Sequence, residues 1–257
     1  KTLTKSITGM SSGFNDPTDW ISTGNFALNY LVSGDFNKGI PLGKVTVFAG
    51  ESGAGKSYIC AGNIVKHAQE QGIFVVLIDS ENALDETWLK ALEVDTDEKK
   101  LLKLNMSMID DVAKTVSTFM DDYRAMNEED RPKVLFVIDS LGMLSTTKEI
   151  DDTASGAETK DMTRAQLVKG TFRVLTLKLG RAGVPLIVTN HTYDEMGLFA
   201  KKVMGGGSGL KYAASSIIFL SKKKEKDGKD VIGNIVHCKN EKSRLTVENK
   251  MVDVMLS

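Results

Sequence analysis

Cysteine, histidine and long apolar runs are scarce in this chain of 257 residues. Its two cysteines, Cys60 and Cys238, lie far apart in apolar segments, which is typical of reduced thiols in a cytosolic protein. Three histidines and two cysteines that do not cluster leave little material for a zinc site. No apolar run approaches the ~18 residues that a membrane span requires, and no signal-peptide pattern opens the chain, so we expect no membrane partner.

An excess of one charge is also missing. The chain holds 33 Lys and Arg against 34 Asp and Glu, a formal net charge of -1, which by itself gives no indication of a nucleic-acid partner. Residues 190–257 carry 12 basic and 8 acidic residues, whereas the rest of the chain is net acidic. Chance on a solvated surface is one interpretation of this asymmetry, and a polyanion contact in the C-terminal quarter is the other.

Apolar runs of strand length alternate with segments of helical spacing. Runs rich in Val, Ile, Leu and Phe are typical of strands buried on both faces of a parallel sheet. The expected strands cover residues 45–49, 73–78, 134–138, 184–188, 217–220 and 232–236, and the expected helices cover residues 57–71, 85–92, 110–126 and 161–181. This alternation predicts an α/β fold with a doubly wound, mostly parallel sheet. The short strands after Ser216 predict a C-terminal antiparallel hairpin region with its tip at Lys226-Asp227-Gly228.

No linker or internal repeat divides the chain. We therefore expect one core domain over residues 21–257, preceded by a polar N-terminal arm over residues 1–20. Two segments, 145–160 and 192–209, are polar and lack periodicity, and each follows an expected strand. Long structureless loops are typically functional, and ligands of open α/β sheets bind at the edge where the strands end.

One segment matches the phosphate-binding pattern G-x-x-x-x-G-K-[ST] and lies between an expected strand and an expected helix. The glycines let successive backbone N–H groups point at an anion, and the helix N-terminus adds its positive end. The pattern predicts an ATP site in which Lys56 contacts the β- and γ-phosphates and the Ser57 hydroxyl ligates Mg²⁺. The expected nucleotide-binding residues here are Gly50, Glu51, Ser52, Gly53, Ala54, Gly55, Lys56, Ser57 and Tyr58.

Two further strands end in residues that suit nucleotide hydrolysis. Asp139 follows the buried run 134–138, as a second ligand for Mg²⁺ does in such folds, and Ser140 would bond to the metal shell or the nucleotide-bound water. Glu81 follows the strand expected at 73–78 and would orient or deprotonate the attacking water. The alternative for Glu81 is an acid favoured at a helix N-terminus by the helix dipole.

Together these motifs resemble the RecA-type recombinases, most closely the phage UvsX-like branch, over nearly the whole chain from Ile21. Ile78-Asp79-Ser80-Glu81-Asn82-Ala83-Leu84-Asp85 is similar to the family segment that carries the catalytic glutamate, here Glu81. The resemblance implies a RecA-like P-loop NTPase core in which Asp85 and Trp88 contact the adenine. A tryptophan of the core is the alternative for Trp88.

Thr189-Asn190-His191-Thr192-Tyr193, followed by Val203-Met204-Gly205-Gly206-Gly207, resembles the UvsX group. The resemblance implies that His191 senses the γ-phosphate and orders the second DNA-binding loop; a structural histidine is the alternative. The two polar segments would be the family's two DNA-binding loops. The first is acidic, so its DNA contacts would run through the backbone, Lys160 or Arg164. In the second, the expected contacts are Lys201, Lys202, Gly205, Gly206 and Gly207.

Glu241-Lys242-Ser243-Arg244 resembles a family Lys-x-Lys pair that reaches the nucleotide of the neighbouring subunit. Lys242 and Arg244 would then act catalytically in trans by stabilising charge on the transferring phosphoryl group. Ordinary surface cations are the alternative.

As a whole, the resemblance implies a DNA-dependent ATPase of homologous recombination and repair. It would form a helical filament on single-stranded DNA and exchange strands with double-stranded DNA, helped by recombination-mediator and single-strand-binding proteins. The expected location is the cytoplasm, that of the host cell if a phage encodes the chain. Full-length members extend further at both ends, so a core with truncated termini is expected. A RecA-fold ring helicase and a RecA-fold signalling ATPase without DNA are the alternatives.

Overall fold

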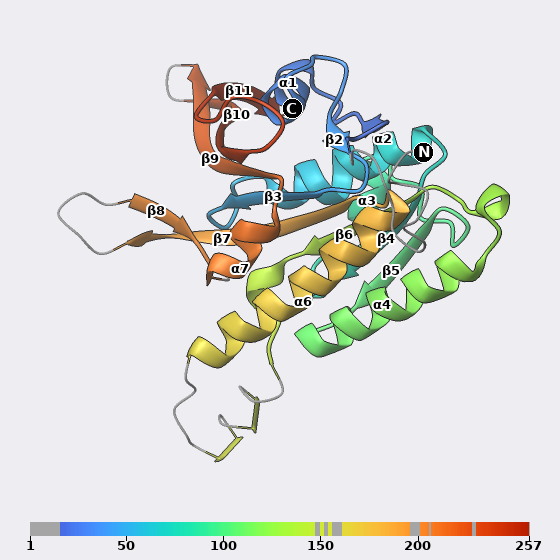
Figure 1. The fold of residues 1–257 in the computed structure, drawn as a ribbon. Helices are drawn as coiled ribbons and strands as arrows, with labels where there is room; N and C mark the ends of the chain where they lie inside the picture. Colours follow the sequence, from blue (N-terminus) through green and yellow to red (C-terminus); the bar gives the residue numbers. More distant parts are fainter. Residues whose placement is uncertain are drawn as a thin grey trace, which may run out of the picture.

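The computed structural model describes residues 16–146, 150–151, 154–155, 161–195, 201–205, 207–227 and 230–256. A large twisted sheet runs through the molecule in the strand order β11-β10-β9-β3-β7-β6-β4-β5 (Figure 1). Its strands are β3 (Val45–Gly50), β4 (Phe74–Asp79), β5 (Leu101–Asn105), β6 (Val134–Asp139), β7 (Leu186–Glu195), β9 (Ser216–Asp227), β10 (Asp230–Ser243) and β11 (Met251–Leu256). The six strands β9, β3, β7, β6, β4 and β5 are parallel to one another. β10 pairs antiparallel with β9 on one side and with β11 on the other. The expected α/β class with a mostly parallel sheet is confirmed.

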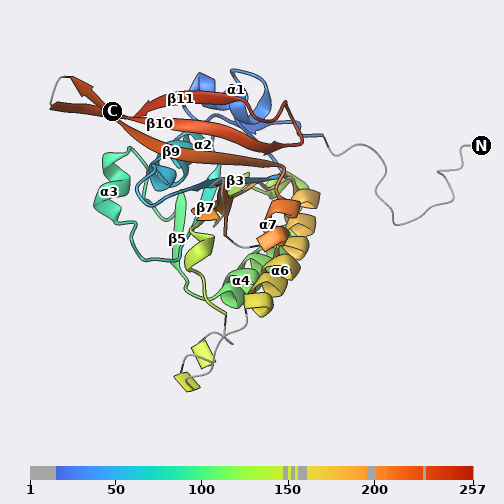
Figure 2. The same cartoon turned by 90° about the vertical axis from the view of Figure 1, so that its left-hand side faces the viewer.

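Helices cover both faces of the sheet (Figure 2). One face carries α1 (Phe26–Ser33), the π-helical turn η2 (Tyr58–Asn63) with α2 (Ile64–Glu70), and α3 (Glu86–Ala91). The other face carries α4 (Ile109–Ala125), α6 (Asp161–Ala182) and α7 (Gly207–Ala213). Short 3-10 turns lie at η3 (Glu128–Asp130) and η4 (Leu141–Met143), and a separate two-stranded sheet joins β1 (Trp20–Ile21) to β2 (Ile40–Pro41).

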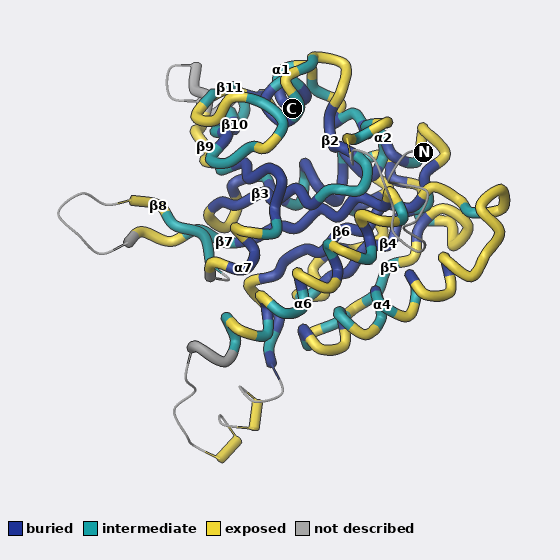
Figure 3. The backbone as a smooth tube through the Cα atoms, viewed as in Figure 1, coloured by how far each residue is buried: buried dark blue, intermediate teal, exposed yellow. Residues whose placement is uncertain are grey.

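Alternation along the strands sends neighbouring side chains to opposite cores. In β4, Val75 and Leu77 pack with α2, whereas Val76 and Ile78 pack with α4. Both sets are buried, which explains why the parallel strands are continuous apolar runs in the sequence. β3 and β6 are buried along their whole length, and the outer faces of the helices are exposed (Figure 3). Among the described helices, none combines the length and the apolarity that crossing a membrane requires.

The second polar segment is not structureless, which corrects the expectation for residues 192–209. β7 continues to Glu195 and pairs antiparallel with β8 (Lys201–Met204), and α7 begins at Gly207. The hairpin escaped prediction because both of its strands are polar and extend beyond the sheet, so they show no apolar period. Most of 145–160 lies outside the described residues.

Other predicted elements differ from the structure at their ends. The helix expected at 57–71 is formed, but it begins as the π-helical turn η2. β9 and β10 form the expected hairpin, with Asp227 paired to Asp230, while Gly228 lies outside the described residues. The arm over residues 1–20 stays a prediction, since residues 1–15 are not described. Of its last residues, Asp19 accepts hydrogen bonds from Leu42 and Lys133, and Trp20 begins β1.

Candidate nucleotide-hydrolysis site

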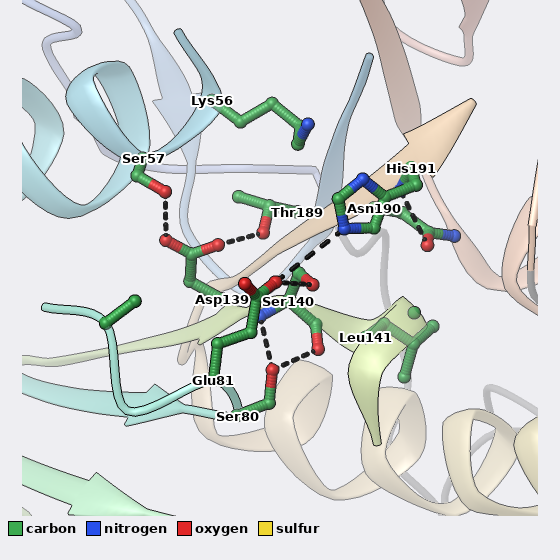
Figure 4. A network of polar contacts seen from close by, with 12 residues as sticks. Lys56, Ser57, Ser80, Glu81, Asp139, Ser140, Leu141, Thr189, Asn190 and His191 are labelled. Carbon is green, nitrogen blue, oxygen red and sulfur yellow. Dashed lines mark hydrogen bonds and ion pairs between the residues drawn. The ribbon is translucent and has the colours of Figure 1, made fainter. Parts of the chain in front are cut away.

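Four parallel strands bring the expected site residues to one edge of the sheet. β3 and β7 pair Gly50 with His191, and β4 and β6 pair Asp79 with Asp139. Residues that follow parallel strands emerge at the same edge, so Glu81 joins this group (Figure 4). The structure therefore brings together the phosphate-loop, metal-ligand, water-activating and sensor residues expected from the sequence.

The phosphate loop, residues 50–57, turns on two glycines in the left-handed region, Gly53 with φ 76° and Gly55 with φ 98°. A side chain at either position would strain the backbone, so the pattern's glycine at 55 has a direct physical cause. Ala54 is buried under the loop, whereas Glu51 and Ser52 are exposed. Tyr58 is half-buried and packs against the core on the α2 side.

Lys56 is buried and curls back over the phosphate loop. Its Nζ donates to the carbonyl oxygens of Gly50 at 2.8 Å and Glu51 at 2.7 Å. Burial lowers the pKa of Lys56, and the negative charge of Asp139 opposes that shift. This ammonium is desolvated and points across the loop, as a phosphate-binding lysine requires.

Asp139 ends β6 as a buried carboxylate with a hydroxyl on each oxygen. Ser57 Oγ donates to Oδ2 at 2.6 Å, and Thr189 Oγ1 donates to Oδ1 at 2.6 Å. Burial raises the pKa of Asp139, while the two hydroxyl hydrogen bonds lower it. Thr189 was not selected as a site residue from the sequence, because its contact with Asp139 spans 50 residues along the chain.

The donor set fits Mg²⁺. Ser57 and Asp139 offer a hydroxyl and a carboxylate, the hard oxygen ligands that this ion prefers. Among the described residues, no group of three or more His, Cys, Asp or Glu side chains could hold a metal ion. A Mg²⁺ ion at Ser57 and Asp139 would therefore complete its shell with phosphate oxygens and water, as it commonly does.

Glu81 lies between the ends of β6 and β7. Its Oε1 accepts a hydrogen bond from Ser140 Oγ at 3.2 Å and lies 3.7 Å from His191 Nε2. Ser140 is fixed in turn by Ser80, whose Oγ accepts from Ser140 N at 2.8 Å and donates to Ser140 O at 2.7 Å. The Asp139–Ser140 peptide bond is cis. Ser80 was not among the residues singled out in the sequence.

Asp79 organises the turn that carries Glu81. Its carboxylate accepts from the backbone N–H of Leu84 at 2.9 Å, and more weakly from Glu81 and Ala83, and pairs with Lys103 at 3.1 Å. Burial raises the pKa of Asp79, but these hydrogen bonds and Lys103 outweigh it and hold the pKa below its ordinary value. An aspartate that ends a strand just before a small polar turn was a usable signal for this role.

His191 connects the site to the second loop. Its carbonyl accepts from Gly205 N at 3.1 Å, and its own N–H donates to Asn190 Oδ1 at 2.9 Å. Asn190 Nδ2 donates to Gly205 O at 2.8 Å. Asn190 is fully buried and was not selected from the sequence.

The expected adenine contacts lie on α3. Asp85 is exposed and occupies the N-cap position in an extended conformation. Trp88 is half-buried and packs against the hydrophobic core. An adenine contact for either residue stays a prediction.

The residues expected to contact DNA lie in different environments. Lys201 and Lys202 are exposed on β8, and Lys202 forms an ion pair with Glu51 of the phosphate loop. Arg164 is turned inward, donating from Nη2 to the carbonyls of Leu141 and Gly142. Gly207 begins α7, whereas Lys160 and Gly206 lie outside the described residues.

Lys242 and Arg244 lie at the opposite edge of the sheet. Ser243 pairs with Ser216, which pairs with Thr46 near the start of β3. Lys242 Nζ donates to the carbonyl of Lys211 at 2.6 Å, and Arg244 Nη2 donates to that of Tyr212 at 2.9 Å. Both side chains therefore bind the C-terminal carbonyls of α7, and the structure does not bring them to the phosphate loop of their own subunit.

The sheet order and the phosphate loop that follows β3 define an α/β P-loop fold of the RecA-like class. The family model for the RecA N-terminal domain matches residues 4–257. A recombination and repair protein of Enterobacteria phage T4 is 31% identical over 249 residues, covering 96% of this chain and 61% of that protein.

Two bacterial RecA proteins are also similar. Those of Corynebacterium urealyticum and Deinococcus radiodurans are each 28% identical, over 240 and 244 residues, covering 92% of this chain and 60% and 62% of their own lengths. The chain belongs to the RecA family, which confirms the resemblance to RecA-type recombinases near the phage branch. It spans about three fifths of the length of these relatives.

Proposed function

We propose that this chain is the ATP-hydrolysing core of a homologous-recombination and repair protein that acts on single-stranded DNA. The contacts of His191 carry the proposal. Its side-chain Nε2 lies 3.7 Å from Glu81 Oε1, and its backbone carbonyl accepts a hydrogen bond from Gly205 N–H. One residue thus joins the hydrolytic centre to the β7–β8 hairpin. The names of the relatives, a recombination and repair protein and RecA, support the same function.

In this function Lys56 binds the β- and γ-phosphates, and the backbone N–H groups of residues 50–57 cradle them. Mg²⁺ held at Ser57 and Asp139 supplies charge neutralisation on the phosphate oxygens. Glu81 accepts the proton of the attacking water, and Ser140 keeps its carboxylate in place at 3.2 Å. Asp79 fixes the turn on which Glu81 lies.

Coupling to DNA runs through the second loop. His191 donates a hydrogen bond to the γ-phosphate, and its backbone contact with Gly205 passes the change to β8. Lys201 and Lys202 then bind the phosphates of single-stranded DNA, which gives sequence-tolerant binding. ATP favours the tight DNA-binding state, and hydrolysis releases it.

Assembly follows from the two edges of the sheet. The phosphate loop lies at one edge, while Lys242 and Arg244 lie at the other. In a head-to-tail contact, these cations exchange the carbonyls of α7 for the neighbour's nucleotide, and stabilise charge on the transferring phosphoryl group. A heterologous contact of this kind repeats as a helical filament when its rotation does not close into a ring. Strand exchange with duplex DNA, mediator and single-strand-binding partners, and a cytoplasmic location belong to the same proposal.

A strand-exchange assay tests the proposal. The chain, given ATP, Mg²⁺ and a single-stranded oligonucleotide, should form joint molecules with a homologous duplex, and Lys56→Ala should form none. Unwinding of the duplex without pairing would instead indicate a RecA-fold helicase. Hydrolysis that does not respond to single-stranded DNA would indicate an ATPase without a DNA substrate. Either result would overturn the proposal.

A further inference from the structure

Asn190 occupies the point where the sensor and the second loop meet. It is fully buried, and its amide oxygen accepts from His191 N–H while its amide nitrogen donates to Gly205 O. Gly205 N–H returns a hydrogen bond to His191 O at 3.1 Å. The three bonds form a closed set, so the strand leaving the site and the strand returning from the hairpin are held by a single side chain.

Gly142 reaches the same point from the turn η4, which precedes the first polar segment. It lies in η4, directly after β6, and a Cβ built on it would come within 3.1 Å of Asn190 Oδ1 and 3.2 Å of His191 Cδ2. These contacts are tighter than a methyl group normally makes, so a side chain at this position requires Asn190 and His191 to shift by a few tenths of an ångström. Arg164 donates to the carbonyl of Gly142 and thereby ties this turn to α6.

We infer that Asn190 is a positioning residue that couples the nucleotide site to DNA binding, and that Gly142 is kept small by Asn190 and His191. The inference rests on the proposed function and deepens it. Among the described residues, the hydrogen bonds of the Asn190 side chain go to the backbone of His191 and Gly205. It acts by fixing where His191 lies relative to the two ends of the hairpin, so a shift of the imidazole is transmitted to β8.

The chemistry of the amide is specific. One end must accept from His191 and the other must donate to Gly205, and the asparagine amide provides the acceptor and the donor on two separate atoms of one short side chain. Asn190→Asp keeps the size and the acceptor but replaces the donor with an oxygen that faces the Gly205 carbonyl. A role confined to supporting the His191 backbone would survive this change, whereas the role inferred here would not.

The experiment measures the affinity of the chain for a fluorescent oligo(dT), with and without a non-hydrolysable ATP analogue and Mg²⁺. The ratio of the two dissociation constants is the coupling, which for linked sites is typically about 5–150-fold. Asn190→Asp and Gly142→Ala should each reduce this ratio at least about threefold, while the affinity for the ATP analogue changes less than about twofold. Gly142→Ala disturbs the position of Asn190 and His191 without changing either residue. Its outcome decides the test if Asn190→Asp does not fold.

Gly170→Ala is the matched control. It makes the same chemical change within α6, where a Cβ meets nothing within 4 Å, and should leave the ratio unchanged. A wild-type ratio in both Asn190→Asp and Gly142→Ala would overturn the inference. A wild-type chain whose affinity for DNA does not respond to the analogue would overturn the proposed function instead, so the two failures are distinguishable.

Discussion

Glu81 Oε1 lies 3.7 Å from His191 Nε2, although Glu81 follows β4 and His191 lies on β7, and β6 separates these two strands in the sheet. Ser140, at the end of β6, bridges the gap by donating to the same carboxylate oxygen at 3.2 Å. Glu81, the expected water-activating residue, and His191, the expected γ-phosphate sensor, therefore lie close enough together for one small ligand group to contact both.

Glu81→Gln should separate binding from turnover. Glutamine keeps an oxygen that accepts from Ser140 but cannot take a proton from water, so ATP affinity should hold while hydrolysis falls about 10²–10⁴-fold. Nucleotide affinity from a fluorescent analogue and hydrolysis from phosphate release measure the two parts. Hydrolysis near the wild-type rate would show that another group activates the water.

Lys56→Ala should remove nucleotide binding. The buried ammonium is the charge that the phosphate loop offers, and its loss leaves only backbone N–H groups. An ATP analogue at about 100 times its Kd should stabilise the wild type by about 2.7 kcal/mol, seen as a rise in Tm, and should leave Lys56→Ala unchanged. Lys114→Ala, an exposed lysine on α4, should behave as wild type. An unaltered rise in Lys56→Ala would reject the phosphate-loop assignment.

Asp79→Asn should destabilise the fold in a pH-dependent way. The folded pKa of Asp79 lies below its ordinary value, so the ionised carboxylate contributes stability above that value, and this is lost as pH falls through the folded pKa. At pH 7 the substitution should cost about 1–3 kcal/mol, roughly 2–10 °C in Tm for a domain of this size. The difference from wild type should shrink in thermal melts at pH 3.5. An equal difference at both pH values would show that the charge is not involved.

The site was predictable where its chemistry fixes residue types at short spacing. Residues 50–57 form one loop, and Asp139 and Glu81 end apolar strands, so each could be found from local sequence. Thr189 and Asn190 could not be placed in the same way. Their roles depend on partners that are distant in sequence or backbone groups that carry no residue identity, such as the carbonyl of Gly205.

The fold shows the same division. The buried parallel strands and the long helices α4 and α6 follow their apolar patterns, whereas β5 and β11 were not predicted. β5 has the sequence Leu-Leu-Lys-Leu-Asn, and it is a strand because it pairs with β4, from Leu101 beside Val75 to Asn105 beside Asp79. β11 lies at the other sheet edge with mostly exposed side chains. Edge strands of this kind are decided by pairing more than by local pattern.

Mixing two inactive variants should test whether Lys242 and Arg244 act in trans. Lys242→Ala with Arg244→Ala removes the cations but keeps the phosphate loop, and Lys56→Ala does the reverse. In a mixed assembly, cations of the Lys56→Ala chain meet nucleotide on its partner, so part of the hydrolysis should return. Phosphate release at fixed total protein and varied mixing ratio measures this, with each variant alone as control. No recovery at any ratio would place these residues outside the neighbour's site.

Lys202 should be shared between the phosphate loop and DNA. It forms an ion pair with Glu51, whose pKa that contact lowers, and it is also an expected DNA contact. Glu51→Gln should therefore release Lys202 and strengthen nucleotide-free binding of single-stranded DNA, by up to about fivefold because an exposed pair is weak. Binding of a fluorescent oligo(dT) without nucleotide measures the change.

A double-mutant cycle shows whether that gain comes from this pair. In a Lys202→Gln background, Glu51→Gln should have no effect on DNA affinity, because the cation it releases is gone. Lys201→Gln is the matched control: this neighbour on β8 lies opposite Glu195 in the hairpin, so its effect should add to that of Glu51→Gln. If both lysines bind DNA phosphates, each substitution should also make the salt dependence shallower by about 0.7 in log–log slope. Additivity in the Lys202 cycle would mean that Glu51 acts on DNA through its own charge, and the ion pair would then have no part in controlling the hairpin.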